Sequence, residues 1–342
     1  MLFDLEGYRL RKLDPAQGTK PLDFGGGGVN GSINLDGRFI AINSYHPEHG
    51  IVTLTSVPPF PDADRYDQAK VRAYRKSLVT NAGFGLAFEQ DIIEREYYLI
   101  EDAVPFLRFT LADGTVAECV TLTDDKWVRQ MWRTSQRTKG KATGNVWLMR
   151  SSYTQLTEGG ILPMPSVKTI LIPHNESQCF LRNDALNRFA SIIGFTDFED
   201  TDSDGLRLNQ DIEVEENFEV GLVIAWSKKK PTQSDFLETL KSTLDIYRAE
   251  LPESNNLVTK RAYIYGSYCS IDTHIEYTNC ILTDHMILPL SWTRDAHYVV
   301  LALNQIEWVG LESQGYISWL KDIAWRGTFC KYFQRPNNRA LP

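Results

Sequence analysis

The feature that most constrains the fold is a succession of short runs of β-branched and aromatic residues in the first two-thirds of the chain. Polar turn residues bound each run, as is typical of strands. Asp113-Gly114, between two of the runs, is a strong hairpin signal. The predicted strands are residues 38–43, 51–55, 94–100, 106–110, 116–121, 128–132, 146–149, 169–172, 179–181, 190–193 and 218–226. About a dozen short strands joined by polar turns predict a large antiparallel β-sandwich over residues 1–230.

Helical periodicity replaces the strand pattern after residue 230. Thr232 is a residue type that favours the N-cap position, and Leu237, Leu240, Leu244 and Tyr247 follow on one helical face. We expect residues 231–255 to form a linker helix and residues 256–342 to form a helical segment. The apolar faces predicted in that segment are Val258, Ala262, Tyr265 and Cys269, then Ala296, Val299, Val300, Leu303 and Ile306, then Tyr316, Leu320 and Ile323.

The charge of the chain favours a neutral substrate. Its 342 residues carry a net charge of −8 without a block of like charges, which argues against nucleic acid or an anionic membrane as partner. No apolar run is long enough for a membrane span, and the acidic start does not resemble a secretory signal. The 5 cysteines are scattered and odd in number, which favours free buried thiols in a reducing compartment. We therefore expect a cytoplasmic protein, and the sequence indicates no cofactor.

A polar cluster near the C-terminal end carries the clearest functional signal. Trp292, Arg294 and Asp295 stand within four residues and directly precede an apolar helical pattern. A Trp ring covers the C–H face of a pyranose, Arg offers a rigid fork of donors, and Asp accepts hydrogen bonds from paired hydroxyls. The cluster therefore suits a sugar. The alternative is an ordinary helix start, with an Arg–Asp pair that only fixes the loop.

Trp292-Thr293-Arg294-Asp295, followed by an apolar helix, resembles the Trp-Thr-Arg-Asp segment of glucoamylases and related six-hairpin glycosidases. The resemblance is specific over residues 255–340 and only architectural before them, where bacterial members commonly carry a β-sandwich. It implies that residues 256–342 begin an (α/α)6 barrel. It also implies that Arg294 and Asp295 hold the hydroxyls of the terminal sugar, and that Trp292 lines the same subsite. An oligosaccharide substrate or ligand is then expected.

The catalytic residues stay unassigned. An inverting glycosidase needs a carboxylic acid and a carboxylate base, and the resemblance places both glutamates on later barrel loops. A complete barrel needs upwards of about 220 residues, so we expect the chain to stop after the first hairpins, short of these glutamates. Asp284 and Glu312 are the other acids near the motif, and exposed loop carboxylates explain both. Two alternatives follow: a non-catalytic carbohydrate- or partner-binding sandwich, and a subunit whose exposed helical segment a second chain covers.

Three further patterns in the sandwich region have structural explanations. Asp200, Asp202, Asp204 and Asp211 imitate the spacing of a calcium loop, but the last position is not Glu and the flanks favour strands. We expect an acidic hairpin turn there and no metal site. Gly25–Gly28 opens no helix and carries no Lys-Ser/Thr pair, so a turn or a close backbone approach is expected rather than a phosphate site. His46 and His49 are expected to be loop residues.

Overall fold

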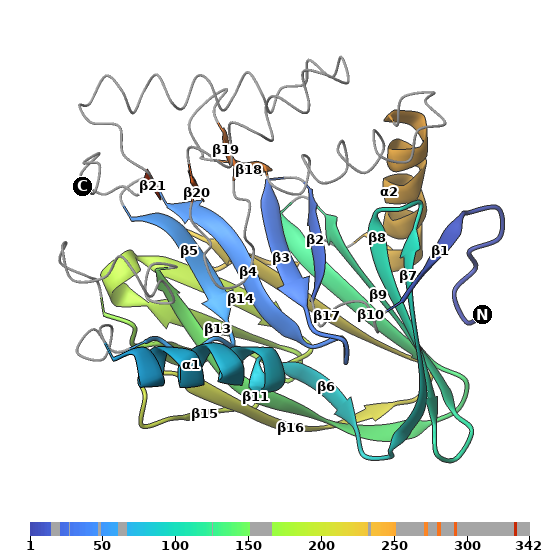
Figure 1. The fold of residues 1–342 in the computed structure, drawn as a ribbon, viewed down its shortest axis with the longest axis horizontal. Helices are drawn as coiled ribbons and strands as arrows, with labels where there is room; N and C mark the ends of the chain where they lie inside the picture. Colours follow the sequence, from blue (N-terminus) through green and yellow to red (C-terminus); the bar gives the residue numbers. More distant parts are fainter. Residues whose placement is uncertain are drawn as a thin grey trace.

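The computed structural model describes residues 1–14, 21–26, 28–46, 49–60, 67–124, 126–150, 166–231, 234–250, 270–272, 279–281, 291–292 and 332–333. Most of these residues belong to two stacked antiparallel sheets (Figure 1). The predicted β-sandwich is therefore confirmed.

The first sheet has nine strands, and every neighbouring pair in it is antiparallel. Hairpins join β7 to β8, β8 to β9 and β9 to β10, while β17 returns from later in the chain to pair with β10. In spatial order the strands are β1 (Leu10–Leu13), β7 (Ile92–Ile100), β8 (Val104–Leu111), β9 (Val116–Asp124), β10 (Trp127–Thr134), β17 (Asn217–Ala225), β14 (Arg188–Ile193), β13 (Gln178–Asn183) and β12 (Ile170–Pro173).

The second sheet has eight strands, and the long β11 is its centre. In spatial order they are β15 (Phe198–Asp200), β16 (Leu206–Val214), β11 (Thr138–Arg150), β5 (Gly50–Thr55), β4 (Phe39–His46), β3 (Val29–Ile33) and β2 (Leu22–Gly26), with β6 (Gly85–Phe88) also paired to β11. The main core fills the space between the sheets with alternate strand residues, among them Ile42, Leu54, Leu148 and Trp132.

Three glycines allow the tight hairpin turn and the close strand packing at the β2–β3 end of the second sheet. Gly26 and Gly28 adopt positive φ angles of 129° and 84° in the hairpin between these strands, a region that favours glycine. At Gly31, a Cβ would lie 2.3 Å from the Ala41 carbonyl oxygen. The predicted turn at Gly25–Gly28 is confirmed.

Helix α1 (Gln68–Asn81), which the sequence pattern does not reveal, covers the lower end of β4 in Figure 1. Asp67 caps it by accepting hydrogen bonds from the backbone N–H groups of Ala69 and Lys70. Among the side chains of α1 that the structure describes, Tyr74 packs on a cluster of Ile40, Val57 and Ala82, and Val71 is buried. A short 3₁₀ helix, η4 (Asp184–Leu186), joins β13 to β14.

Helix α2 (Phe236–Glu250) confirms the helix predicted after residue 230. It begins later than predicted, and its cap is Asp235, which accepts hydrogen bonds from the N–H groups of Leu237 and Glu238 at 2.8 and 3.0 Å. Thr232 lies outside the described residues. Leu237 is only partly buried; the fully buried face is Phe236, Leu240, Leu244 and Tyr247.

The buried face of α2 packs on the outer side of the nine-stranded sheet, together with the N-terminal residues (Figure 1). Phe3 and Leu5 share this second apolar cluster with Phe106 and Val120 of the sheet. The buried carboxylate of Glu118 holds the N-terminal segment by accepting hydrogen bonds from the N–H groups of Leu2 and Phe3.

Arginines fix both ends of α2. At its start, Arg129 of β10 donates to the Ser234 carbonyl at 3.0 Å and to Glu219 at 2.7 Å. At its end, Arg248 donates to Glu101 at 2.9 Å, and the Tyr247 hydroxyl reaches the Gly25 carbonyl at 3.3 Å. The helix is therefore an integral part of the sandwich rather than a free connection.

The described residues after 256 form short strands. They are β18 (Ser270–Asp272), β19 (Asn279–Ile281), β20 (Ser291–Trp292) and β21 (Tyr332–Phe333). β18 pairs with β19 and lies against β3 and β4, and β19 lies beside β20. The apolar faces predicted for residues 256–342 fall outside the described part of the chain.

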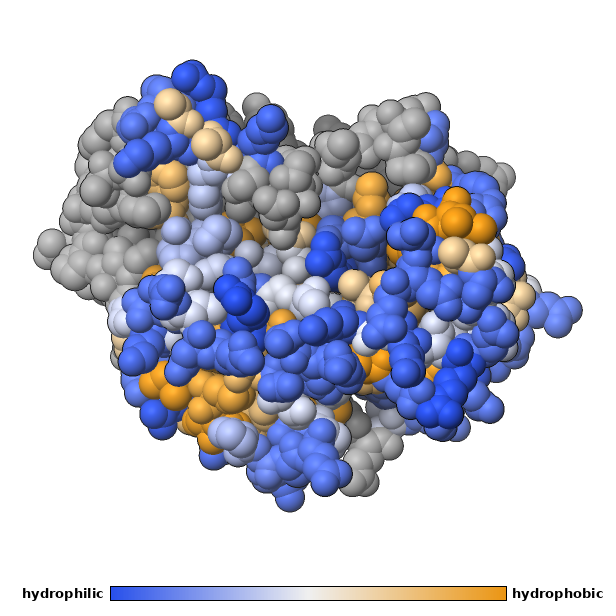
Figure 2. All heavy atoms as spheres, turned by 90° about the horizontal axis from the view of Figure 1, so that it is seen from below, coloured by the Kyte–Doolittle hydropathy of each residue, from blue (hydrophilic) through white to orange (hydrophobic). Residues whose placement is uncertain are grey.

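The surface seen from below in Figure 2 is mostly hydrophilic, with small separate hydrophobic areas. Among the described residues, the large apolar side chains that stay exposed are Met1, Ile93, Trp226 and Ile246. No described helix has the length and apolar character needed to cross a membrane. Cys119 and Cys179 are free buried thiols, as predicted, and Cys280 is buried as well.

Candidate functional site

The structure describes one member of the predicted sugar-binding cluster, Trp292. It lies in β20, which pairs antiparallel with β21 so that Trp292 is opposite Tyr332 and Ser291 is opposite Phe333. Because β19 lies beside β20 and β18 lies against β3 and β4, a series of short strands connects Trp292 to the eight-stranded sheet. Arg294, Asp295, Asp284 and Glu312 lie outside the described residues, so the sugar-binding cluster stays a prediction.

The outer face of β3, β4 and β5, to which β18 is adjacent, is buried and polar. Directly opposite residues of antiparallel strands share a face, and Asn30, Asn43 and Thr53 are opposite one another across the three strands. Each is at most 1% exposed. The Asn43 amide donates to the Asn30 carbonyl oxygen at 3.1 Å. This face points away from the sandwich core, on the outside of the eight-stranded sheet.

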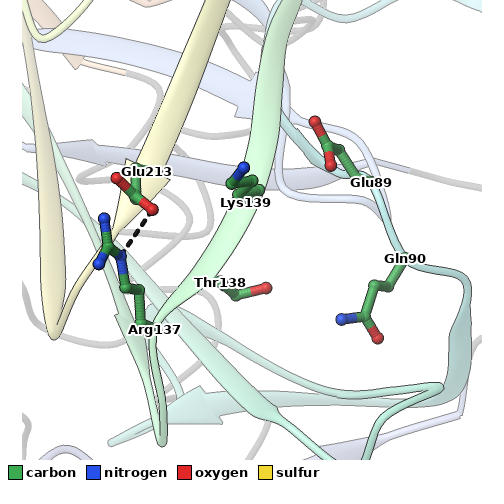
Figure 3. Close-up of a pocket in the computed structure, with 6 residues that line it drawn as sticks. All are labelled: Glu89, Gln90, Arg137, Thr138, Lys139 and Glu213. Atoms are coloured by element: carbon green, nitrogen blue, oxygen red, sulfur yellow. Dashed lines mark hydrogen bonds and ion pairs between the residues drawn. The ribbon is translucent and has the colours of Figure 1, made fainter.

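A pocket of about 520 Å³ lies where β6 ends and β11 begins (Figure 3). Arg137 and Glu213 are ion-paired at 2.6 Å on one side, and Glu89 and Gln90 line the other. The hydrogen bond from Arg137 lowers the pKa of Glu213, and the same bond raises the pKa of Arg137. Glu213 is therefore ionised at neutral pH, which suits a structural ion pair and not a proton donor to a glycosidic oxygen.

A second pocket, of about 430 Å³, is lined by basic and aromatic side chains where β17 ends and β14 begins. The Arg188 guanidinium lies over the Trp226 ring, 3.0 Å from its centroid. Lys126, Lys229 and Lys230 also line this pocket. None of the described lining residues is a carboxylate, which distinguishes it from the pocket of Figure 3. Sequence periodicity does not reveal it, because its residues come from four separate segments.

The two histidines lie next to this second pocket. His46 is the last residue of β4 rather than a loop residue, and it is 2% exposed. Its Nε2 is 2.9 Å from the Leu186 carbonyl oxygen, and its Nδ1 accepts a hydrogen bond from the His49 N–H. The His46 ring centroid lies 4.9 Å from that of Trp226. The two histidines therefore pack at the end of β4.

The four carboxylates with calcium-loop spacing do not form a group that could hold a metal ion. Thr201–Gly205 is the hairpin turn between β15 and β16, closed by the Thr201 hydroxyl, which donates to the Gly205 carbonyl at 2.9 Å. Asp204 has a positive φ of 60° in this turn. Asp211 lies farther along β16, opposite Lys141 of β11. No other described group of His, Cys, Asp and Glu side chains could hold a metal either.

These features define an antiparallel β-sandwich in which α2 covers one sheet and the short strand β18 lies against β3 and β4 of the other. No protein-family model matches the sequence, and no curated protein is detectably similar to it. Solved structures do share the fold. A bacterial glucoamylase complexed with acarbose matches with a TM-score of 0.50 and 10% identity, over 98% of this chain and 54% of that chain.

A protein described as a kojibiose phosphorylase from the human microbiome also matches, with a TM-score of 0.45 and 10% identity, over 88% of this chain and 47% of that chain. The chain thus spans about half the length of these solved structures. The likeness to the glucoamylase confirms the predicted resemblance at the level of the fold.

Proposed function

We propose that this chain is part of a glucoamylase-like glycoside hydrolase, in which Trp292, Arg294 and Asp295 hold the terminal sugar of an oligosaccharide. The observation that supports the proposal is the match of this chain to a solved glucoamylase structure, which covers 98% of the chain, together with the Trp-Thr-Arg-Asp segment in its sequence. Arg and Asp together provide donors and acceptors for neighbouring hydroxyls, and Trp provides a flat apolar surface for the sugar ring.

The contacts of β18 with β3 and β4 support a specific arrangement of the sandwich and the C-terminal segment. Asn30, Asn43 and Thr53 are buried polar residues on β3, β4 and β5, and a polar face of this kind can fix a docked segment through directional hydrogen bonds, as a purely apolar face would not. We propose three regions: the sandwich at 1–230, a connecting helix at 231–255 and a barrel-like segment at 256–342. The arginines at both ends of α2 support a rigid connection between the outer regions.

A second candidate function is non-catalytic binding of a carbohydrate or protein partner by the sandwich. The pairing of Glu213 with Arg137 in the pocket of Figure 3 supports it, because this carboxylate has a lowered pKa and does not serve as an acid. A third possibility follows from the proposed barrel-like segment, which a second chain would cover if its apolar faces were otherwise exposed.

Both functions are tested by one pair of measurements on the chain. Release of reducing sugar is followed with a panel of α-linked and β-linked oligosaccharides, and binding of the same sugars is measured by calorimetry. Arg294→Gln and Asp295→Asn are expected to weaken binding by about tenfold or more, because each removes hydrogen bonds to sugar hydroxyls. Arg137→Gln and Glu213→Gln are matched controls that break an Arg–carboxylate pair elsewhere, and they should bind as the parent does.

The outcomes separate the two candidates. Turnover that Asp295→Asn abolishes indicates a complete active site in this chain or between copies of it. Binding without turnover, weakened by the same variant, favours the non-catalytic function. Unchanged binding in both Arg294→Gln and Asp295→Asn contradicts the role proposed for the cluster, and loss of binding in the control variants would move the sugar to the pocket of Figure 3.

A further inference from the structure

Residues 1–6 lie between α2 and the outer face of β8, β9 and β10 without forming a helix or strand of their own. We propose that this surface is a peptide-binding site, and that residues 1–6 are its resident ligand, separable from the rest of the sandwich. The peptide site is defined by Phe106, Glu118 and Arg133 of the sheet and Phe236 of α2. It recognises the backbone of an extended segment and one aromatic side chain.

Two charged side chains on neighbouring strands bind the backbone of Leu2. Glu118 of β9 and Arg133 of β10 are directly opposite each other, so they share one face of the sheet. Glu118 Oε2 accepts hydrogen bonds from the N–H groups of Leu2 and Phe3 at 2.6 and 3.1 Å. Arg133 Nη1 donates to the Leu2 carbonyl at 2.6 Å. Both backbone groups of one residue are therefore bound, as in the recognition of extended peptides through their main chain.

The carboxylate of Glu118 is directed at this segment. Glu118 is fully buried, and its Oε1 lies 3.7 Å from Arg108 Nε and accepts no hydrogen bond from the described residues. The hydrogen bonds described for this carboxylate therefore both come from the backbone of Leu2 and Phe3. Burial of a carboxylate is costly unless its hydrogen bonds are completed. An empty peptide site would therefore favour the binding of another peptide backbone.

Phe3 supplies the side-chain recognition. It is 2% exposed, and its ring centroid lies 6.3 Å from that of Phe106, edge to face, and 6.5 Å from that of Phe236. The Arg133 guanidinium carbon is 5.4 Å from the same centroid. One aromatic ring thus contacts both the sheet and α2. Leu5 is the second buried anchor of the segment. The site therefore selects an aromatic residue followed two positions later by an aliphatic one.

The segment ends at an exposed turn, which makes it separable. Glu6 and Gly7 are exposed, and a Cβ at Gly7 would meet nothing within 4 Å. Beyond the turn, Arg9 and Arg11 are both ion-paired with Asp102. The start of β1 is therefore attached to the sheet by contacts that residues 1–6 do not share, and it does not depend on them for its place.

Cleavage of the folded, full-length chain tests the proposal. A protease recognition sequence is inserted between Glu6 and Gly7, the purified protein is cut, and a synthetic peptide of residues 1–6, labelled at its C-terminal end, is titrated against it. We expect the cut chain to keep the circular dichroism of the sandwich, and the labelled peptide to replace the bound segment, seen as a rise in fluorescence anisotropy. A Phe3→Ala peptide should bind about tenfold or more weaker. A Met1→Ala peptide should bind as the parent does, because Met1 is 63% exposed.

A matched pair of variants tests the backbone recognition. Glu118→Gln in the cut chain should weaken the parent peptide by about tenfold, because it removes a charged acceptor of two N–H groups. Glu96→Gln removes the same charge from the same face of the sheet. Its hydrogen bonds go to Lys12 and Tyr98 instead, so the dissociation constant should not change.

The proposal is overturned if the labelled peptide does not bind the cut chain up to about 1 mM, or if the two substituted peptides bind equally well. Equal losses in Glu118→Gln and Glu96→Gln would contradict it too, as would a cut segment that neither leaves nor exchanges. If the cut chain unfolds, hydrogen exchange of the uncut chain decides. Phe3→Ala should then speed the exchange of the α2 amides and leave β11 unchanged, whereas faster exchange in both sheets contradicts a separable segment.

Discussion

The two outer faces of the sandwich are each buried in part, but by different chemistry. Over the nine-stranded sheet, α2 and the N-terminal residues supply Phe3, Leu240 and Leu244 to an apolar cluster. Over β3, β4 and β5 of the eight-stranded sheet, the buried residues include Asn30, Asn43 and Thr53. An apolar face needs only a matching shape, whereas a buried polar face must have its hydrogen bonds completed.

The two faces therefore differ in what can cover them. The apolar face is stabilised by any well-packed helix in the right position, and here two arginines keep α2 in that position. The polar face is stable only with a partner whose donors and acceptors match it. We infer that α2 stabilises the sandwich, and that the polar face of Asn30, Asn43 and Thr53 specifies how the segment containing β18 docks.

The largest expected effect is on the apolar face. Leu244 of α2 is completely buried, whereas Ile246 on the same helix is 51% exposed. Leu244→Ala should lower the free energy of unfolding by about 3 kcal/mol, because it removes buried methyl groups and leaves a cavity. Ile246→Ala should change it by less than about 0.5 kcal/mol. Urea unfolding followed by circular dichroism measures both, and equal losses would mean that α2 does not pack as described.

The arginine at the start of α2 should have the next largest effect. Arg129 is 5% exposed and joins β10 to Glu219 and to the Ser234 carbonyl. Arg129→Gln is expected to cost about 2 kcal/mol, since it leaves the Glu219 carboxylate without its cation. Hydrogen exchange of the α2 amides should become faster in this variant. Arg137→Gln, which breaks an exposed pair, should leave that exchange unchanged; a similar acceleration there would argue against a local role for Arg129.

The polar face is tested by removing one hydrogen-bond partner and then both. Asn43→Leu removes the donor of the bond to Asn30 while the Asn30 amide stays buried, and should cost about 1–2 kcal/mol. The Asn30→Leu/Asn43→Leu variant should lose less than the sum of the two single changes, because no half of the pair is left behind. Additive losses in chemical unfolding would show that the two amides are not coupled.

The smallest effect is expected at the edge strand β1. Lys12 donates to Glu96 of β7 at 2.6 Å, and this bond is the main reason that the pKa of Glu96 is lowered. A lowered carboxyl pKa in the folded state stabilises the fold above the pKa of the unfolded chain, and this contribution is lost as the pH falls through the folded pKa. The exposed pair contributes little.

Lys12→Gln should therefore lower the stability slightly at neutral and higher pH and leave it unchanged below the folded pKa of Glu96, which flattens the acid side of the stability–pH curve. Thermal unfolding between about pH 3 and pH 7 measures it. Lys241→Gln, which breaks the exposed pair with Asp4, is the matched control on the same side of the molecule. An equal change in the control would assign the effect to net charge and not to the Lys12–Glu96 bond.

Short runs of β-branched and aromatic residues bounded by polar turns predicted the sandwich, and Phe218–Trp226 is the longest of them. The sequence pattern did not predict α1, whose sequence is mostly polar. The start of α2 was placed too early, since Thr232 and Asp235 are both residue types that favour N-caps and the hydrogen bonds to Asp235 decide between them.

The candidate sites also differ in whether the sequence alone could reveal them. Trp292, Arg294 and Asp295 form a contiguous motif, so sequence alone could single them out. The pocket beside Trp226 combines Lys126, Arg188 and Lys229–Pro231. These residues meet only because β14 and β17 are paired, a long-range register that no local pattern encodes. The polar outer face depends on which side of β4 faces the core, and that too is a property of the assembled sheets.

The fixing of α2 at both ends also sets a local concentration. Because Tyr247 and Arg248 are tied to Gly25 and Glu101, the chain beyond α2 starts from a defined point on the sandwich. Tethered groups meet at effective concentrations of the order of millimolar when the linker matches the span. The docking of β18 on β3 and β4 is then an intramolecular association, for which weak contacts between these strands are sufficient.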